Sequence, residues 1–290
     1  MKTKALSVIL SLLICTSCDF RKSVEKDLLT GMVTRGNGLS CESVTLKVDE
    51  KAVQSRRFTY GEKFHVNFNN MEGFVSVAGH VFPGMSLLVT GQNGDTVLST
   101  QDLYAEYAEG MDLSPLLLIS TVTVADPIHS NGTYILRVNI WDKKGDGVFT
   151  ANLDFTVVPN DQIQVWSDQL SYKEIYLYSE QRGKVITDQK ARFNENIYIL
   201  IEGLDGLVEE NGSFSVGLGM KVSDADGNLI IDEEDLLGDS GYSYEQMHGQ
   251  LSAHFILTGS QVLNPVDVEI VVWDKHGDGK LNISTQLLIN

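Results

Sequence analysis

Hydrophobic and polar side chains alternate along several short stretches of the chain, and the clearest alternation comes in two pairs. In the first pair the apolar positions are Tyr134, Leu136, Val138 and Ile140, followed by Phe149, Ala151, Leu153, Phe155 and Val157. In the second pair they are Val266, Val268, Ile270 and Val272, followed by Leu281, Ile283, Leu287 and Ile289. Successive side chains of a strand point to opposite faces of a sheet, so the pattern predicts four strands that each bury one face.

The same polar segment joins the two strands of each pair. Residues 141–147 read Trp-Asp-Lys-Lys-Gly-Asp-Gly, and residues 273–279 read Trp-Asp-Lys-His-Gly-Asp-Gly. Glycine adopts positive φ without a Cβ clash, and aspartate bonds to nearby backbone N–H groups, so both residues favour tight turns. Strand, turn and strand together predict a β-hairpin in each place.

The hairpins close two copies of a longer repeat. The matching positions are Glu62, Gly73, Gly84, Val89, Gly94, Asp102 and Leu103 in the first copy, and Glu195, Gly206, Gly217, Val222, Gly227, Asp235 and Leu236 in the second. We therefore expect two domains, 32–158 and 162–290, with a short linker that makes a semi-rigid rod. Both copies alternate strands and turns, with one short helical turn expected within residues 102–111.

A hairpin placed last in each repeat resembles the F–G hairpin that closes an immunoglobulin-like sandwich. This resemblance implies two antiparallel sheets packed face to face in each copy. The predicted fold is therefore all-β, with two tandem immunoglobulin-like β-sandwich domains.

The amino-terminal segment is typical of an export signal. Lys2 and Lys4 precede an apolar run at residues 5–14, which is too short to span a bilayer. Ser17 and Cys18 resemble a bacterial lipobox, although Cys15 stands where that motif usually has Leu. We expect residues 1–17 to be a lipoprotein signal peptide, Cys18 to carry the lipid, and residues 18–31 to be a tether. A cleaved signal without lipid is the alternative.

With these features the chain resembles a Bacteroidota-type envelope lipoprotein. The resemblance implies attachment to the outer membrane through the lipid, and it leaves the periplasmic and cell-surface faces both open. The acidic residues that can direct such proteins to the surface are weakly represented, because Asp19 is followed by Phe20, Arg21 and Lys22.

Composition limits the possible partners. The formal net charge of −17 argues against nucleic acid, which such a chain would repel. Solubility explains the acidity better than an acidic ligand-binding role does. Cys41 is the cysteine that would remain after processing, so no intramolecular disulfide is expected. Tyr172 takes its place in the second copy, which indicates a half-buried strand position instead of a reactive thiol.

Calcium prefers hard oxygen ligands, and two kinds of acidic segment suggest it: residues 224–235, and the Gly-Asp turns of the two hairpins. The candidate ligands are Asp224, Asp226, Asn228, Asp232 and Asp235. A calcium loop needs glycine where Leu229 stands, so the competing interpretation is a tight hairpin. At the Gly-Asp turns that follow Asp142 and Asp274, the spacing of oxygen ligands fails and a plain hairpin turn is expected. No other cofactor is indicated.

Trp141 and Trp273 occupy equal places beside the two turns. Each could stack on a sugar or a protein, or pack across its own hairpin, and the second interpretation is the simpler one. No nucleophile elbow, phosphate loop or zinc-protease motif occurs. The leading hypothesis is a non-catalytic lipoprotein that binds an envelope protein or glycan or acts as a spacer. The alternatives are a carbohydrate-binding lipoprotein of a glycan-uptake system and an unrecognised envelope hydrolase.

Overall fold

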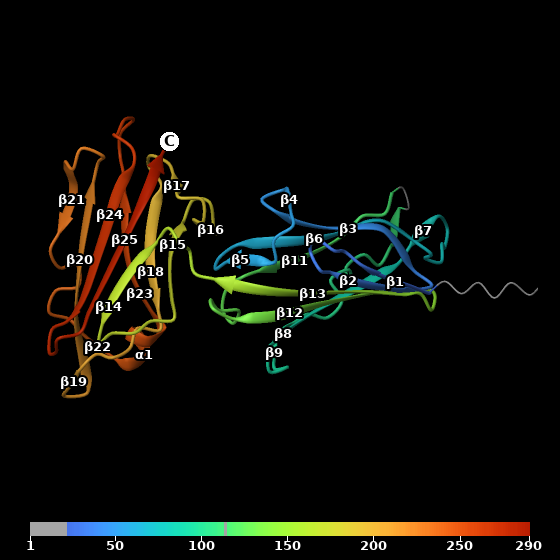
Figure 1. Cartoon of the computed structure of the whole chain (residues 1–290), viewed down its shortest axis with the longest axis horizontal. Helices are drawn as coiled ribbons and strands as arrows, with labels where there is room; N and C mark the ends of the chain where they lie inside the picture. The colour runs from blue at the N-terminus through green and yellow to red at the C-terminus, as the bar shows by residue number, and fades with distance from the viewer. Residues whose placement is uncertain (1–21, 113–114) are drawn as a thin grey trace, which may run out of the picture.

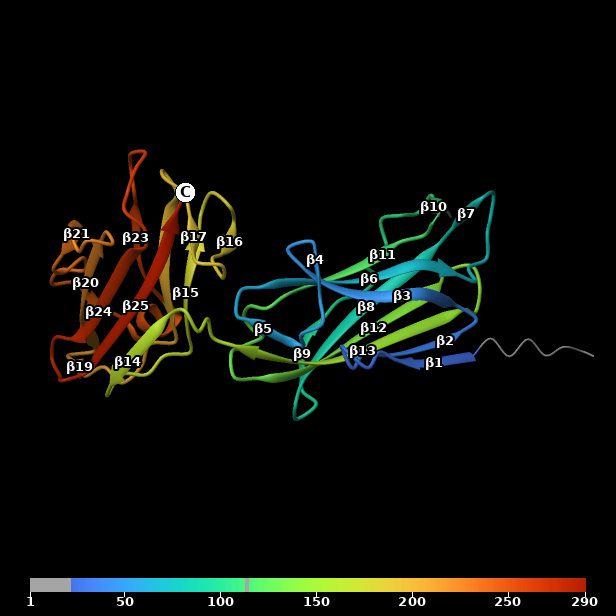
Figure 2. The same ribbon diagram turned by 45° about the horizontal axis from the view of Figure 1, so that its top comes forward.

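The structure is a computed structural model that describes residues 22–112 and 115–290. The described chain forms two β-sandwiches placed end to end (Figure 1). Strands of the first sandwich run along the long axis of the molecule, and those of the second run across it (Figures 1 and 2). The fold is all-β, as predicted. The expected signal peptide and Cys18 lie outside the described residues.

The first sandwich has two main sheets. One has the order β1-β2-β13-β12-β8-β9, with β5 beside β13, and the other has the order β11-β6-β3-β4. A two-stranded sheet of β10 and β7 lies apart from them. The strands are β1 (Lys22–Lys26), β2 (Val33–Asn37), β3 (Ser40–Val48), β4 (Lys51–Val53), β5 (Arg57–Thr59), β6 (Lys63–Glu72), β7 (His80–Val81), β8 (Pro83–Gly91), β9 (Thr96–Ser99), β10 (Met111–Asp112), β11 (Leu118–Thr123), β12 (Thr133–Asp142) and β13 (Val148–Val158).

The second sandwich repeats this plan. Its larger sheet has the order β14-β25-β24-β20-β19, with β17 beside β25 and both β21 and β22 beside β20, and its smaller sheet has the order β16-β15-β18-β23. The strands are β14 (Gln164–Asp168), β15 (Glu174–Ser179), β16 (Lys184–Val185), β17 (Lys190–Ala191), β18 (Asn196–Glu202), β19 (Glu209–Glu210), β20 (Ser213–Ser223), β21 (Leu229–Glu233), β22 (Gly241–Tyr242), β23 (Gln250–Ile256), β24 (Val266–Asp274) and β25 (Lys280–Ile289).

Both predicted hairpins are present. Strand β12 pairs antiparallel with β13, and β24 pairs antiparallel with β25. The apolar positions that defined the alternation are buried in both pairs. They belong to two separate clusters of buried hydrophobic residues, one in each sandwich. The period-two pattern therefore identified the core-facing side of these four strands correctly.

Two local predictions need correction. Residues 22–31 were expected in a tether, but residues 22–26 form β1, which pairs with β2 at the edge of the first sandwich. The side chains of β1 are exposed throughout, so no hydrophobic alternation marked it as a strand. Residues 102–111 form turns and the start of β10, and no helix.

The described residues contain one helix, α1 (Tyr244–Gly249), which the sequence pattern did not indicate. It begins at a capping box, in which the Ser243 hydroxyl accepts from the Gln246 backbone N–H (3.3 Å) and the Gln246 side chain accepts from the Ser243 N–H (2.8 Å). Within the described ranges, no helix has both the length and the apolar character needed to cross a membrane.

A buried aspartate holds each hairpin turn. Asp142 and Asp274 are both 4 % exposed, and each carboxylate accepts one backbone N–H from its own turn and one from a distant loop. The sequence predicted the local bond but not the distant one. The donors are Val75 (2.7 Å) and Lys144 (2.9 Å) for Asp142, and Val208 (2.7 Å) and His276 (2.9 Å) for Asp274.

The two repeated tryptophans pack against their own sandwiches. Trp141 lies opposite Gly84 on β8, and Trp273 lies opposite Gly217 on β20. A Cβ atom added to either glycine would come within 2.1 Å and 2.0 Å, respectively, of the indole ring. The glycines therefore provide the surface that the indoles cover, which agrees with the simpler interpretation of these tryptophans.

Candidate functional site

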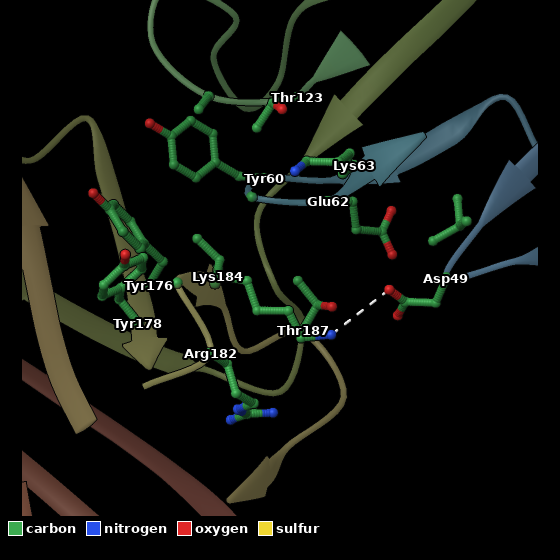
Figure 3. Close-up of a pocket in the computed structure, with 15 residues that line it drawn as sticks. Asp49, Tyr60, Glu62, Lys63, Thr123, Tyr176, Tyr178, Arg182, Lys184 and Thr187 are labelled. Carbon is green, nitrogen blue, oxygen red and sulfur yellow. Dashed lines mark ion pairs between the residues drawn. The ribbon is translucent and has the colours of Figure 1, made fainter. Parts of the chain in front are cut away.

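A cleft lies where the two sandwiches meet. It has a volume of about 450 Å³ and is lined from both sides. The first sandwich contributes the turn between β5 and β6 with Tyr60, the turn after β3 with Asp49, and the end of β11 with Thr123. The second contributes β15 and the hairpin that leads into β16, with Tyr178 and Lys184 (Figure 3).

Two tyrosines, one from each sandwich, share a carboxylate beside this cleft. The Tyr60 hydroxyl donates to Glu202 Oε2 (3.3 Å) and accepts from the Asp126 N–H (3.2 Å). The Tyr176 hydroxyl donates to Glu202 Oε1 (2.5 Å), and the two ring centroids lie 5.3 Å apart. Burial, and then the Glu202 carboxylate, raises the pKa of both hydroxyls. Both therefore remain donors at neutral pH.

A second carboxylate crosses the junction next to this group. Glu174 is 2 % exposed, and its Oε1 accepts from the Ser130 backbone N–H of the first sandwich (2.6 Å). The His129 Nδ1 atom lies 3.6 Å from the same oxygen, and the other ring nitrogen lies 3.2 Å from Asp126. Burial raises the pKa of Glu174, and its bond from Ser130 and the His129 ring act against that shift.

Close packing completes the junction. Gly61 has a φ of +91°, and a Cβ atom there would lie 2.3 Å from Cβ of Val185 in the other sandwich. Only glycine combines this backbone conformation with this approach. Lys184 Nζ lies 3.6 Å from Asp49 Oδ1 across the cleft (Figure 3). Both groups are well exposed, so the ion pair adds little to stability.

Asp49 and Glu62 place two carboxylates in the cleft, the arrangement that a glycoside hydrolase would require. The repeat assigns one of them a structural role. Glu62 Oε2 accepts from the Thr59 N–H (2.8 Å), and Glu195 makes the same bond in the second copy, from the Arg192 N–H (2.7 Å). Burial raises the pKa of Glu62. The described lining of the cleft contains no serine, cysteine or histidine to act as a nucleophile or base.

The predicted calcium ligands, all among the described residues, do not form a metal-binding cluster, and a bond from the Asn228 amide to the Asp224 carboxylate (3.0 Å) joins two of their side chains. The Asp224 carboxylate accepts from its own hairpin, from the Asp226 N–H (3.0 Å) and the Asn228 N–H (2.9 Å). Asp232 lies 3.7 Å from Lys221 on the paired strand. Among the described residues, no group of three or more histidine, cysteine, aspartate or glutamate side chains is placed to hold a metal ion.

The last proposed ligand, Asp235, belongs to an ion pair that both copies contain. Lys275 Nζ lies 2.6 Å from Asp235 Oδ2, and Lys143 Nζ lies 2.5 Å from Asp102 Oδ2. Burial opposes ionisation of both carboxylates, but the ammonium group and two backbone N–H donors outweigh it, so their pKa values lie below the usual range. These lysines directly follow the turn aspartates, which explains why a basic residue stands in a turn that resembles a cation loop.

Cys41 lies on β3 and is half-buried, in line with the strand position expected for it. Its thiol donates towards the Ser43 and Asn69 carbonyl oxygens (3.1 and 3.3 Å). Burial raises the pKa of the thiol to about 11, so almost none of it is thiolate at neutral pH.

The sequence patterns did not predict the residues that join the sandwiches, although the repeat contains a signal for them. Strand pairing places Glu174 and Glu202 where the first copy has Ser43 and Asn69. By the same alignment Tyr176 replaces Thr45, and Tyr60 stands where the second copy has Phe193. The junction is therefore built from positions at which the two copies differ in polarity or charge.

Comparisons with known proteins give only weak likenesses. No family profile matches the chain, and no curated protein sequence matches it. The C-terminal domain of Wzt is 13% identical, with a TM-score of 0.28 and coverage of 45% of this chain and 79% of that one. Fibronectin(III)-like modules of Clostridium thermocellum CbhA are 10% identical, with a TM-score of 0.21 and coverage of 84% and 94%.

Three N-terminal domains of the bacteriophage RB49 outer capsid protein Hoc are also 10% identical, with a TM-score of 0.21 and coverage of 89% and 77%. Scores this low do not relate the roles of these proteins to this chain. The β-sandwich assignment follows from the sheets themselves.

Proposed function

We propose that this chain is a membrane-anchored, non-catalytic lipoprotein that acts as a spacer and protein-binding module of the bacterial cell envelope. The observation that carries the proposal is the junction, in which Glu174, Glu202 and two tyrosines fix one sandwich against the other. A hydrogen-bonded, desolvated contact of this kind restricts the relative motion expected for domains joined by a short linker.

The position of strand β1 supports the spacer role. Strand β1 is the described segment nearest to Cys18 in sequence, and it lies at the end of the molecule away from the second sandwich (Figures 1 and 2). A fixed junction would then hold the second sandwich at a set distance from the lipid. The anchor itself rests on the sequence around Cys18, and replacing Cys18 with alanine is expected to abolish labelling by palmitate and to release the protein from membranes.

Rigidity is the property to test. Ser99→Cys and Asp226→Cys, both at exposed positions, provide one attachment point for a spin label on each sandwich. Cys41→Ser removes the remaining thiol of the described residues. Pulsed electron–electron distance measurements are expected to give one narrow distribution. Gly61→Ala would push Val185 away and broaden that distribution.

Gly79→Ala is the matched control. Gly79 has a similar φ of +88°, but a Cβ atom there meets nothing within 4 Å. It therefore reproduces the backbone strain without touching the junction. A broad distribution in the unmodified protein, or equal broadening by both substitutions, would overturn the spacer role.

A further inference from the structure

The two copies differ at one edge of their larger sheets. In the first sandwich, β2 is covered on its outer side by β1. Its counterpart in the second sandwich is β14, which pairs with β25 in the same way. Within residues 22–112 and 115–290, β14 ends the order of its sheet and no strand covers its outer side. Figure 2 shows β14 at the lower edge of the second sandwich.

An uncovered edge normally carries a feature that prevents pairing, such as lysine, proline or a bulge. Strand β14 reads Gln-Val-Trp-Ser-Asp; it has no lysine, proline or bulge, and Asp168 at its end is its one charged side chain. Its central residue, Trp166, is 57% exposed. An exposed tryptophan on an open edge is typical of a surface that a partner covers.

Strand β1 shows which sequence such an edge can accept. In the first sandwich Lys22, Val24 and Lys26 lie opposite Asn37, Arg35 and Val33. Aligning the two hairpins places Asp168, Trp166 and Gln164 at those three positions of β14. An antiparallel strand in the same register would set a basic residue opposite Asp168 and an apolar residue opposite Trp166.

The third position is also favourable to a basic residue. Gln164 lies in one row across the sheet with Ser284 and Glu269. Asp161, Asp267 and Glu269 line a polar cleft of about 440 Å³ beside this row. Lys280, opposite Asp168, is the basic residue of β25 that faces β14. The surroundings of the Gln164 end are thus more acidic than those of the Asp168 end.

We propose that the outer edge of β14 is a strand-addition site for an extended segment of a partner protein with basic, apolar and basic residues at alternate positions. Main-chain hydrogen bonds supply the affinity of such a complex, and the side chains opposite Trp166 and Gln164 set its register. This inference rests on the proposed function, because it locates the partner-binding surface of a module whose junction is described above.

The probe is a synthetic peptide with the sequence of residues 21–27, acetylated and amidated, titrated into the full mature chain. The protein has three tryptophans, so their indole N–H signals in a ¹H–¹⁵N spectrum form a compact readout. The Trp166 signal is expected to shift and saturate, while those of Trp141 and Trp273 stay in place.

Charge substitutions at Gln164 test the register. Gln164→Glu is expected to strengthen binding and Gln164→Lys to weaken it, by about threefold each, since a cross-strand charge pair contributes roughly 0.2–1 kcal/mol. A peptide with glutamate in place of Lys26 should invert this order. A peptide with glutamate in place of Lys22 should leave it unchanged.

Three results would overturn the inference. The first is no saturable shift of the Trp166 signal at millimolar peptide, and the second is an order of affinities among the Gln164 variants that stays the same when Lys26 of the peptide is replaced by glutamate. The third is concentration-dependent self-association of the protein through β1, which would make a second copy of the chain the occupant. None of these depends on the distance distribution across the junction. A failure of peptide binding at β14 would therefore leave the spacer role unaffected, and a broad label-to-label distance distribution would leave the strand-addition site unaffected.

Discussion

The smaller sheets of the two sandwiches carry different side chains at equivalent places. In the first, Ser43 and Asn69 bond to each other on a solvent-facing surface. In the second, Glu174 and Glu202 take those places and bond to the first sandwich. The two copies thus share bonds inside each sandwich and differ on the outer surface. Bonds found in both copies therefore stabilise the fold of each sandwich, whereas side chains found in one copy serve contacts with the other sandwich or with a partner.

The turn aspartates test the shared part of this comparison. Asp142→Ala and Asp274→Ala each leave two backbone N–H groups without an acceptor inside the protein, at a cost of about 2–4 kcal/mol. Urea denaturation followed by tryptophan fluorescence is expected to show equal losses for the two variants. Asp146→Ala and Asp278→Ala are matched controls at exposed positions of the same turns, and a comparable loss there would contradict the assigned role.

The contact between tryptophan and glycine comes next in size. Gly84→Ala and Gly217→Ala each force an indole ring to move, which costs about 1–3 kcal/mol as overpacking does in other cores. Gly91→Ala, in the same strand as Gly84, meets its nearest atom at 3.8 Å and should be close to neutral. Thermal unfolding measures all three, and a second substitution, Trp141→Val, should recover most of the loss in Gly84→Ala.

The repeated ion pairs predict a shared response to acid. The pKa of Asp102 is lowered on folding, so its ionisation stabilises the protein above the unfolded pKa of 3.8, and this contribution is lost as pH falls through the folded pKa. Lys143→Met is expected to cost about 1–2 kcal/mol at pH 7 and to flatten the decline in stability below pH 4. Lys275→Met should behave alike, and unequal acid responses of the two variants would argue against equivalent pairs.

Glu174→Gln probes the part that differs between the copies and has the smallest expected effect. The pKa of Glu174 is raised on folding, so its contribution to stability is complete below the unfolded pKa of 4.5 and declines as pH rises through the folded pKa. Glutamine still accepts from Ser130 but has no charge. The variant should therefore gain in thermal stability relative to the parent between pH 4.5 and 7.

His129 and Glu202 also face Glu174, so the measurement is repeated with His129→Gln to remove the imidazole. The matched position in the first copy is Ser43, where a change to alanine should have no pH-dependent effect. If Glu174→Gln and the parent differed in thermal stability by the same amount at every pH, burial would not be destabilising the ionised Glu174 carboxylate.

Sequence patterns predicted what depends on neighbouring residues along the chain. Alternation around Val138 and Ile270 revealed the hairpins because each strand buries one face. Strand β1 was not predicted because both its faces are exposed. It is held by backbone hydrogen bonds to β2, which hydrophobic alternation does not reveal. The bond from Val75 to Asp142 and the contact of Gly61 with Val185 join segments far apart in sequence, so spacing alone could not predict them.

In each sandwich the strand synthesised last, β13 or β25, lies inside its sheet with neighbours on both sides. The larger sheet of each copy can therefore form completely only after the last strand of that copy has been synthesised. Until then, two incomplete halves of the sheet present open edges, a state prone to mispairing. The first copy is complete before the last strand of the second copy has been made, so the unfinished second copy keeps its open sheet edges for longest.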